Sequence, residues 1–293
     1  MNVFSGFDGM SCGQLALKKA GFKVDNYYAS EIEKAPIEVT QYNFPNTIQL
    51  GDICKIDASE LKPIKLAMAG SPCQDLSGIL GEEGEGLDGN KSKLFFEFVR
   101  ILKEAKPEYF LLENVEMKQE YEDIISEILG VKPVRINSNL FAPQNRPRLY
   151  WTNIEIQPLP AAECYLTLSD IMEPIQDIPA KEFYNVDFTY HQTGFVAATL
   201  NFNHNYQMTK RCYRDTAKSP CLTVISGGGH EKKVMQDFRP RKMSPLEYER
   251  AQTVPDNYTN VNGMIPNKRR SMLGNGWTVD VIAHILSGMS NED

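Results

Sequence analysis

Short apolar runs alternate with amphipathic stretches through the first half of the chain. The apolar runs have the length and composition of buried strands, and they occupy residues 2–4, 26–30, 66–69, 109–112 and 134–136. The amphipathic stretch 92–105 has an apolar stripe at helical spacing, formed by Phe95, Phe98, Val99 and Leu102. Strands that alternate with helices in this way predict an α/β fold, with a mainly parallel sheet and helices packed on it.

The alternation breaks down near Gln157. From there to about Arg241 the chain is polar and aromatic, and its hydrophobic positions recur at short spacing. Prolines interrupt it at 158, 160, 174 and 179. This pattern predicts a smaller, irregular, mostly β module. The segment Ser244-Pro-Leu-Glu247 has the signature of a helix start with a capping-box glutamate. We therefore expect one domain from residues 1–156 and 268–293, and a second from 157–267.

Composition limits the class of protein. The 293 residues are 42% hydrophobic, which suffices for a substantial core in one large or two modest domains. No run of eighteen apolar residues occurs and the first residues lack a signal peptide's basic region, so neither a membrane span nor export is expected. Six cysteines without a Cys-x-x-Cys pair predict neither a disulfide framework nor a metal site. We expect a cytoplasmic, reducing location.

The distribution of charge changes this picture. A net charge of −7 taken alone disfavours a polyanionic partner. The segment 210–242, however, contains only three acids against nine cations, which are Lys210, Arg211, Arg214, Lys218, Lys232, Lys233, Arg239, Arg241 and Lys242. A nucleic-acid partner and a solvated basic face are both compatible with this cluster.

Two candidate reactive groups follow two of the predicted strands. Cys73 comes after the run 66–69 in Gly-Ser-Pro-Cys, before a glycine-rich loop, and Glu113-Asn114 ends the run 109–112. Because open α/β sheets bind ligands beyond the carboxyl ends of their strands, a thiol and an acid there predict a nucleophile and a proton donor. The alternatives are a buried structural thiol and an acid that caps the next helix.

A short segment further on offers positive charge that could activate a thiol. In Gln144-Asn-Arg146-Pro-Arg148 the two arginines alternate, so an extended backbone turns both to one side. An ordinary loop with surface arginines is the other interpretation.

The turn after the first strand has the features of a cofactor site. It runs from Phe4 to Gly13 and contains glycines that let the backbone approach a ligand closely. Glu31 ends the second strand, where an acid can accept from ribose hydroxyls, and Asp52 follows Gly51, where it can accept from an exocyclic amine. These features predict a pocket for an adenosine-bearing cofactor. The turn lacks both the Gly-x-Gly-x-x-Gly spacing and a Walker lysine, so it does not provide for a pyrophosphate.

Six motifs, in their order along the chain, resemble those of the cytosine-C5 DNA methyltransferases. They are Phe7-Asp8-Gly9, Pro72-Cys73, Glu113-Asn114-Val115, Gln144-x-Arg146-x-Arg148, the segment 243–255 with its Ser-Pro-Leu-Glu start, and Gly274-Asn275-Gly276-Trp277. The resemblance covers nearly the whole chain except about 157–240. Its details are most similar to the catalytic domain of the eukaryotic de novo branch. Since the chain has no room for that branch's regulatory domains, we expect a stand-alone bacterial or phage-type enzyme.

The resemblance implies a Rossmann-like fold of the S-adenosylmethionine-dependent methyltransferases, with a β-rich target-recognition domain in 157–267. The implied cofactor is S-adenosylmethionine, with its adenine on Phe7 and its ribose at Glu31. The cofactor-binding residues implied in full are Phe7, Asp8, Gly9, Met10, Ser11, Cys12, Glu31, Ile32, Asp52, Ile53, Pro72, Asn275, Gly276 and Trp277. Ser11 and Cys12 replace two glycines that are common in the family's turn.

The implied reaction is methyl transfer to C5 of a cytosine flipped out of duplex DNA. Cys73 would attack C6, Glu113 would protonate N3 and Arg148 would support O2, which makes C5 electron-rich. The implied catalytic residues are Cys73, Glu113, Arg146, Arg148, Asn114 and Gln144. The glycine-rich loop 74–91 would close over the DNA.

Double-stranded DNA is the implied partner, with cations of 157–240 on phosphates and a few side chains on bases. The residues expected at the DNA are Ser77, Arg211, Lys218, Thr223, Gly227, Gly228, Gly229, Lys232 and Arg239. Cys221 stands where the family usually has the threonine of a Thr-Leu pair. DNA methylation within restriction-modification is the expected role, and homo-oligomerisation stays open.

Three other functions also stay open. The first is the RNA-directed branch of the superfamily, which methylates tRNA cytosine; the basic segment favours DNA over this substrate. The second is a catalytically inactive regulatory homologue, against which the retention of Cys73, Glu113 and Arg148 argues. The third is a nicotinamide-dependent oxidoreductase, against which the missing dinucleotide-binding glycine spacing argues.

Overall fold

The computed structural model describes residues 1–71, 93–204, 206–225 and 229–290. Packing divides the chain into two compact units. The first consists of Met1–Asn137, Pro147–Leu159 and Val281–Asp293, and the second of Ser138–Arg146 and Pro160–Asp280. This division places residues 268–280 in the second unit, whereas the sequence groups them with the first. The functional domain limits stay a prediction.

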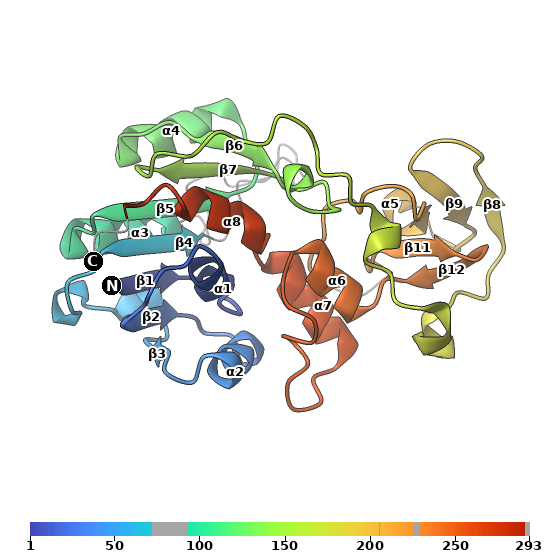
Figure 1. Cartoon of the computed structure of the whole chain (residues 1–293), viewed down its shortest axis with the longest axis horizontal. Helices are drawn as coiled ribbons and strands as arrows, with labels where there is room; N and C mark the ends of the chain where they lie inside the picture. Colours follow the sequence, from blue (N-terminus) through green and yellow to red (C-terminus); the bar gives the residue numbers. More distant parts are fainter. Residues whose placement is uncertain (72–92, 205, 226–228, 291–293) are drawn as a thin grey trace. The chain divides into compact units, whose positions relative to one another are not determined.

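The first unit is built on a mainly parallel sheet (Figure 1). In its described residues the strand order is β3-β2-β1-β4-β5-β7-β6. Their bounds are β1 Asn2–Gly6, β2 Asn26–Ser30, β3 Ile48–Gln49, β4 Leu66–Gly70, β5 Tyr109–Asn114, β6 Val134–Asn137 and β7 Pro147–Thr152. Strands β1 to β5 pair in parallel, and β7 runs antiparallel to both β5 and β6. The predicted α/β sheet is confirmed. Strand β7 is absent from the strands that the apolar pattern predicts, because it begins with Pro147 and Arg148.

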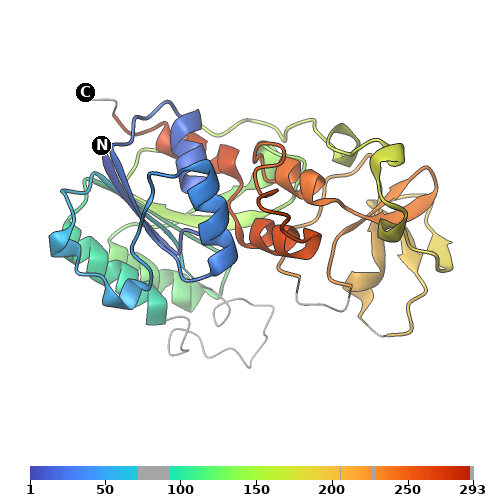
Figure 2. The ribbon, with the colours of Figure 1, turned by 90° about the horizontal axis from the view of Figure 1, so that it is seen from below.

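Helices cover both faces of this sheet. Figure 2 shows α1 (Cys12–Lys19) and α2 (Lys34–Asn43) on one face, and α3 (Lys93–Ala105) and α4 (Gln119–Leu129) on the other. The predicted stripe of α3 is buried: Phe95, Phe98 and Val99 join one apolar cluster with Ala67, Ala69, Leu112 and Trp151 of the sheet. Small alanine side chains on β4 leave room for the phenylalanine rings of α3. Helix α8 (Val279–Leu286) begins in the second unit and continues into the first.

The second unit contains the predicted small β module, which is confirmed. Its sheet has the order β12-β11-β10-β9-β8. The strands are β8 Phe188–Tyr190, β9 Val196–Leu200, β10 Arg211–Tyr213, β11 Lys233–Gln236 and β12 Arg239–Lys242. The helices are α5 Gln207–Lys210, α6 Pro245–Ala251 and α7 Pro266–Asn275. Helix α6 begins as the sequence predicts, because Glu247 N donates to Ser244 Oγ at 3.1 Å and Ser244 N donates to the Glu247 carboxylate at 2.8 Å.

Short 3-10 turns connect these elements at Ile53–Lys55, Ala58–Glu60, Ser138–Leu140, Leu168–Asp170, Ile175–Asp177 and Ala180–Glu182. No helix in the described part of the chain is both long and apolar enough to cross a membrane.

Candidate functional site

The carboxyl ends of β1, β2 and β4 meet at one edge of the first unit's sheet. Strand β1 pairs with both β2 and β4, so the chain order reverses beside it. Such a switch point is where open α/β sheets bind ligands. The predicted cofactor turn leaves β1 at this point, and Glu31 leaves β2. Their contact is direct, because Gly9 N donates to Glu31 Oε2 at 2.8 Å.

Asp8 braces the turn from inside. The Tyr27 hydroxyl donates to Asp8 Oδ1 at 2.7 Å, the Ser11 hydroxyl donates to Oδ2, and Asp8 N donates to Ser30 O at 3.0 Å. Burial is the main reason that the pKa of Asp8 rises to about 6. Phe7, Gly9 and Ser11 all have positive φ angles, between 55° and 60°. Ser11 adopts the left-handed backbone conformation that a glycine would adopt here. Unlike a glycine, it also donates a hydrogen bond from its side chain to Asp8.

Glu31 is an organised acceptor. Its Oε1 accepts from Ile32 N at 2.7 Å and from Glu33 N at 2.8 Å, while Oε2 accepts from Gly9. A carboxylate has about four acceptor positions, so three amide bonds leave one for a ligand hydroxyl. Ile32 is 72% exposed, which is unusual for isoleucine and leaves an apolar surface beside the carboxylate.

Asp52 and Ile53 come from the next connection. Ser30 Oγ donates to Gly51 O at 2.7 Å, which ties Asp52 to the end of β2. The Asp52 carboxylate accepts from Cys54 N at 3.1 Å and caps the short turn that follows. Ile53 is 3% exposed and belongs to the apolar core, so its side chain supports the end of β1. Its predicted contact with a ligand base stays a prediction.

An acid and a cation meet at the end of β5. Arg148 Nε lies 2.9 Å from Glu113 Oε1, and both side chains are largely buried. The pair forms because β7 runs antiparallel beside β5 and brings Arg148 near Glu113 from 35 residues along the chain. The sequence analysis assigns Arg148 to the thiol or to the substrate and does not predict this pairing with Glu113. A buried guanidinium fixes the orientation of a carboxylate through charge-assisted hydrogen bonds.

Asn114 ties this pair to the end of β4. Gly70 of β4 is the register partner of Glu113, and Asn114 Nδ2 donates to Ser71 Oγ at 3.0 Å. Ser71 lies two residues before Cys73, the predicted nucleophile, so the last described residue before Pro72-Cys73 is held beside the acid. Ser71 is a positioning residue that the sequence analysis does not identify, since a buried serine after a strand has no distinctive pattern. Pro72, Cys73 and Ser77 themselves lie outside the described residues.

Gln144 and Arg146 have their partners in the second unit. Arg146 donates to Leu222 O at 2.8 Å, Gly276 O at 3.0 Å and Gly274 O at 3.1 Å. Gln144 accepts from Leu222 N at 2.9 Å. Both side chains are buried. Arg146 and Arg148 are thus engaged by different groups, and the geometry makes Gln144 and Arg146 supports of the segment around Leu222. Their predicted catalytic role stays a prediction.

Within the predicted DNA-contacting region, the segment 221–225 is held in place by close packing and by hydrogen bonds to its backbone. A Cβ on Gly274 would lie 2.4 Å from the Thr223 carbonyl, so a glycine is needed in α7 for this close approach. Ile225 N donates to Ser271 Oγ at 3.1 Å. Thr223 is itself exposed, and its hydroxyl accepts from Lys232 Nζ at 3.2 Å. Gly227 and Gly228 lie outside the described residues.

The Gly274-Asn275-Gly276-Trp277 motif also belongs to the second unit. Gly276 O accepts from both Arg146 and Gln252, whose Nε2 lies 3.1 Å away. Gln252 is fully buried and accepts from the Thr278 hydroxyl at 2.7 Å. The sequence analysis gives Gln252 no role, although its motif is identified. The cofactor contacts predicted for Asn275, Gly276 and Trp277 stay predictions.

The cations of 210–242 are not a uniformly solvated basic face. Arg241 and Glu247 are both fully buried, with Nη2 and Oε1 2.6 Å apart. Lys218 Nζ donates to Cys164 O at 2.7 Å and to Leu166 O at 3.0 Å. Lys233 is buried, and this burial lowers its pKa to about 8.

Arg239 remains exposed, with its guanidinium carbon 4.1 Å from the centre of the Phe183 ring. Arg211 and Lys232 are partly exposed. Gly229 is partly exposed and its carbonyl accepts from Lys233 Nζ at 2.6 Å. The DNA contacts expected of all these residues, Lys218 included, stay predictions.

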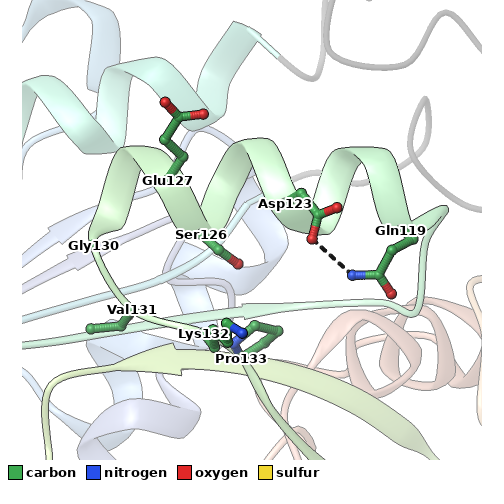
Figure 3. Close-up of a pocket in the computed structure, with 8 residues that line it drawn as sticks. All are labelled: Gln119, Asp123, Ser126, Glu127, Gly130, Val131, Lys132 and Pro133. Carbon is green, nitrogen blue, oxygen red and sulfur yellow. Dashed lines mark hydrogen bonds between the residues drawn. The ribbon is translucent and has the colours of Figure 1, made fainter.

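A separate hollow of about 450 Å³ lies along α4 (Figure 3). Its lining includes Asp123, Glu127 and Lys132, and Gln119 donates to Asp123 Oδ1 at 2.9 Å. None of the predicted site residues lines this hollow. The candidate site therefore consists of the strand-end groups described above.

Comparison with known proteins gives a consistent result. A family model described as C-5 cytosine-specific DNA methylase matches residues 1–291. The type II methyltransferase M.NgoBV of Neisseria gonorrhoeae is 33% identical over 171 residues, 52% of this chain and 40% of that protein. The orphan methyltransferase M.SPRI of Bacillus phage SPR is 32% identical over 163 residues, 51% of this chain and 37% of that protein. The matches thus span about two fifths of these relatives' length.

The fold has solved counterparts as well. The structure of the Entamoeba histolytica methyltransferase EhMeth covers 98% of this chain and 97% of its own, with a TM-score of 0.78 and 15% identity. At this identity the likeness concerns the fold alone, and it confirms the methyltransferase fold that the sequence predicts.

Proposed function

Because the chain belongs to the C-5 cytosine-specific DNA methylase family, we propose that it methylates C5 of a flipped cytosine in duplex DNA. The methyl donor is S-adenosylmethionine, and Cys73 forms a transient bond to C6. The observation that carries this proposal is the Glu113–Arg148 pair, with Asn114 holding Ser71 beside it.

The end of β2 and the turn after β1 suit an adenosine-containing donor. Glu31 has a remaining acceptor position for a ribose hydroxyl, and Ile32 offers an exposed apolar surface for the adenine. Asp52 can accept from the exocyclic amine. The bound group supplies an electrophilic methyl on a sulfonium. The residues of this chain bind and orient it, and the turn around Asp8 fixes their positions.

The chemistry on the cytosine belongs to Cys73 and Glu113. As the thiolate bonds to C6, the C5–C6 π pair shifts to C4–C5, the C4–N3 π pair moves to N3, and N3 takes a proton from Glu113. Arg148 holds the Glu113 carboxyl and is proposed also to donate to O2. The electron-rich C5 takes the methyl group, a base removes the C5 proton, and the C6–S bond breaks to release the thiolate. Covalent attack thus divides one difficult substitution into easier steps.

Duplex DNA is the proposed substrate, held in part by the segment 221–225. Gln144, Arg146 and Gly274 fix the backbone of this segment, while the Thr223 side chain is exposed. Groups that are fixed in advance lose less entropy on binding, so a supported segment of this kind favours specific contact.

Transfer of a labelled methyl group tests the proposal. Purified chain is incubated with labelled S-adenosylmethionine and either duplex DNA or tRNA, alongside Cys73→Ser. We expect label in duplex DNA with the wild type and none with the variant. Label in tRNA alone would assign the chain to the RNA-directed branch, and equal labelling by Cys73→Ser would overturn the covalent mechanism.

A mechanism-based trap isolates the covalent step. A duplex that carries 5-fluorocytosine at a methylated position is incubated with the protein and S-adenosylmethionine. Once C5 has received the methyl group, it has no proton to lose, so the C6–S bond cannot break by elimination. We expect a denaturation-resistant adduct that peptide mapping locates at Cys73. An adduct at another residue would refute the assignment.

A further inference from the structure

A concave surface lies on the second unit, and its lining does not include the segment 221–225. The lining comes from the β8–β9 hairpin with its 191–195 turn, from Gln207 of α5 and from Arg211 of β10. The hollow has a volume of about 650 Å³. Strand β8 pairs only with β9 among the described strands, and all three of its residues are exposed. The hairpin therefore forms an exposed edge of the sheet.

The turn of this hairpin is rigidly organised by Arg214. Its Nη2 donates to His191 O at 2.6 Å, its Nε to Gly194 O at 2.9 Å and its Nη1 to Tyr190 Oη at 3.2 Å. Gly194 has a φ of +83°, which glycine adopts without strain. One guanidinium thus fixes both sides of the turn. A loop whose only task is to connect two strands does not need three bonds from one arginine.

Aromatic contacts strengthen the same region. The rings of Phe195 and Tyr213 stack with centroids 6.1 Å apart and an interplanar angle of 15°. The strand register shifts between Cys212 and Tyr213, so β10 carries a bulge at this position. Bulges redirect side chains and are frequent beside functional sites.

The lining has the chemistry of a nucleobase reader. Gln192 at the turn and Gln207 on α5 offer amides, Thr193 offers a hydroxyl, and Arg211 offers a guanidinium from β10. No Asp or Glu is among the described residues that line the hollow. Glutamine binds adenine and arginine binds guanine through paired hydrogen bonds in the major groove, and a two-stranded ribbon fits that groove. A simple phosphate site would not need the amides.

We propose that this hollow reads base edges flanking the target cytosine, with Gln192 and Arg211 as the discriminating side chains and Arg214 as the residue that holds the turn carrying Gln192. The inference rests on the proposed function, since it assigns sequence specificity to the same reaction. Base contacts specify a site, whereas phosphate contacts only position the protein.

The test compares substrate preference rather than total activity. A duplex library with randomised bases around cytosine is methylated by the wild type and by Gln192→Ala, Arg211→Gln and Arg214→Lys. Bisulfite sequencing then gives the preference at each flanking position. Gln176→Ala is the matched control, because Gln176 is an exposed glutamine of the same unit that does not line the hollow. A parallel selection by binding uses the same library without methyl donor.

We expect Gln192→Ala and Arg211→Gln each to lower discrimination at particular flanking positions by roughly 5- to 150-fold, the range of one paired base contact. Arg214→Lys should lower discrimination at the position that Gln192 reads, because lysine cannot hold three acceptors in one plane. The control should keep the wild-type preference.

Two outcomes would overturn the inference. Unchanged preference in both Gln192→Ala and Arg211→Gln would show that the hollow reads no bases. A uniform loss of binding at every sequence, steeper at high salt, would show phosphate contact only. If the wild type methylates no sequence, the proposed function fails instead, and the binding selection still tests the hollow.

Discussion

The substitution Gly274→Ala tests how the second unit supports the segment 221–225. The added Cβ would lie 2.4 Å from both the carbonyl carbon and oxygen of Thr223, and 2.8 Å from Val224 N. These are backbone atoms, so no side-chain rotation relieves the clash. The segment must move by about 1 Å to restore ordinary contact distances.

That displacement has a calculable cost. Inserting one methyl group into a packed interior costs about 1–3 kcal/mol. The same shift stretches the bonds of Leu222 to Gln144 and Arg146, and a lost buried hydrogen bond costs about 1 kcal/mol. We expect the free energy of unfolding to fall by about 2–4 kcal/mol. With a urea dependence of about 2 kcal/mol/M, the unfolding midpoint falls by about 1–2 M.

Urea unfolding followed by tryptophan emission measures the effect, because Trp277 lies in the second unit. Lys268→Ala is the control, since it also adds alanine to α7 but at an exposed position, where the change should stay within about 0.5 kcal/mol. Duplex affinity should fall with Gly274→Ala and not with the control. Equal stability of the two variants would refute the close approach of Thr223 to Gly274.

Three further predictions follow from the site. Glu113→Gln should lower the single-turnover methylation rate by about 100- to 10,000-fold while the urea midpoint changes little, because it removes the proton donor and keeps the shape; a rate within tenfold of wild type would contradict the role. Burial raises the pKa of Asp8, so its protonated form stabilises the fold below the unfolded pKa, and this stability is lost as pH rises toward about 6. Asp8→Asn should therefore gain in urea midpoint over wild type between pH 4 and 7, and a constant difference would contradict the burial. Arg239→Ala should reduce the salt dependence of duplex binding by about one unit, whereas Lys218→Ala should lower stability and leave that slope unchanged.

Sequence pattern predicted the parts of the fold that depend on local order. The apolar runs that form β1, β2, β4 and β5 are mostly buried, so their pattern is clear, whereas β6 is short and buries only Ile136 fully. Strand β7 differs, because Pro147 and Arg148 give it a polar start and its pairing partner β5 is distant in the chain. Long-range antiparallel pairing leaves no local signal, although it is what brings Arg148 to Glu113.

The sequence predicted which residue types belong to the candidate site, but it did not predict which of those residues contact one another. Glu31 and the turn at residues 7–12 are near in sequence to the strands that position them, and their hydrogen bond fits the expected pocket. The bond between Asn114 and Ser71 joins residues 43 positions apart. Asn114 belongs to the Glu-Asn-Val motif, but nothing in that motif points to Ser71, so this link between the ends of β4 and β5 emerges only from the register of the two strands.

The basic segment shows why a count of cations is a poor guide to a nucleic-acid surface. Whether a cation faces solvent depends on acids that lie elsewhere in the chain. Arg241 falls inside the segment, but its partner Glu247 begins the following helix, so the charge is neutralised in the core. Lys218 is satisfied by carbonyl groups more than fifty residues away. The available positive charge is therefore smaller than the sequence indicates. A site that depends on fewer cations must rely more on shape and on directed hydrogen bonds, which is the role proposed for the hollow lined by Gln192 and Arg211.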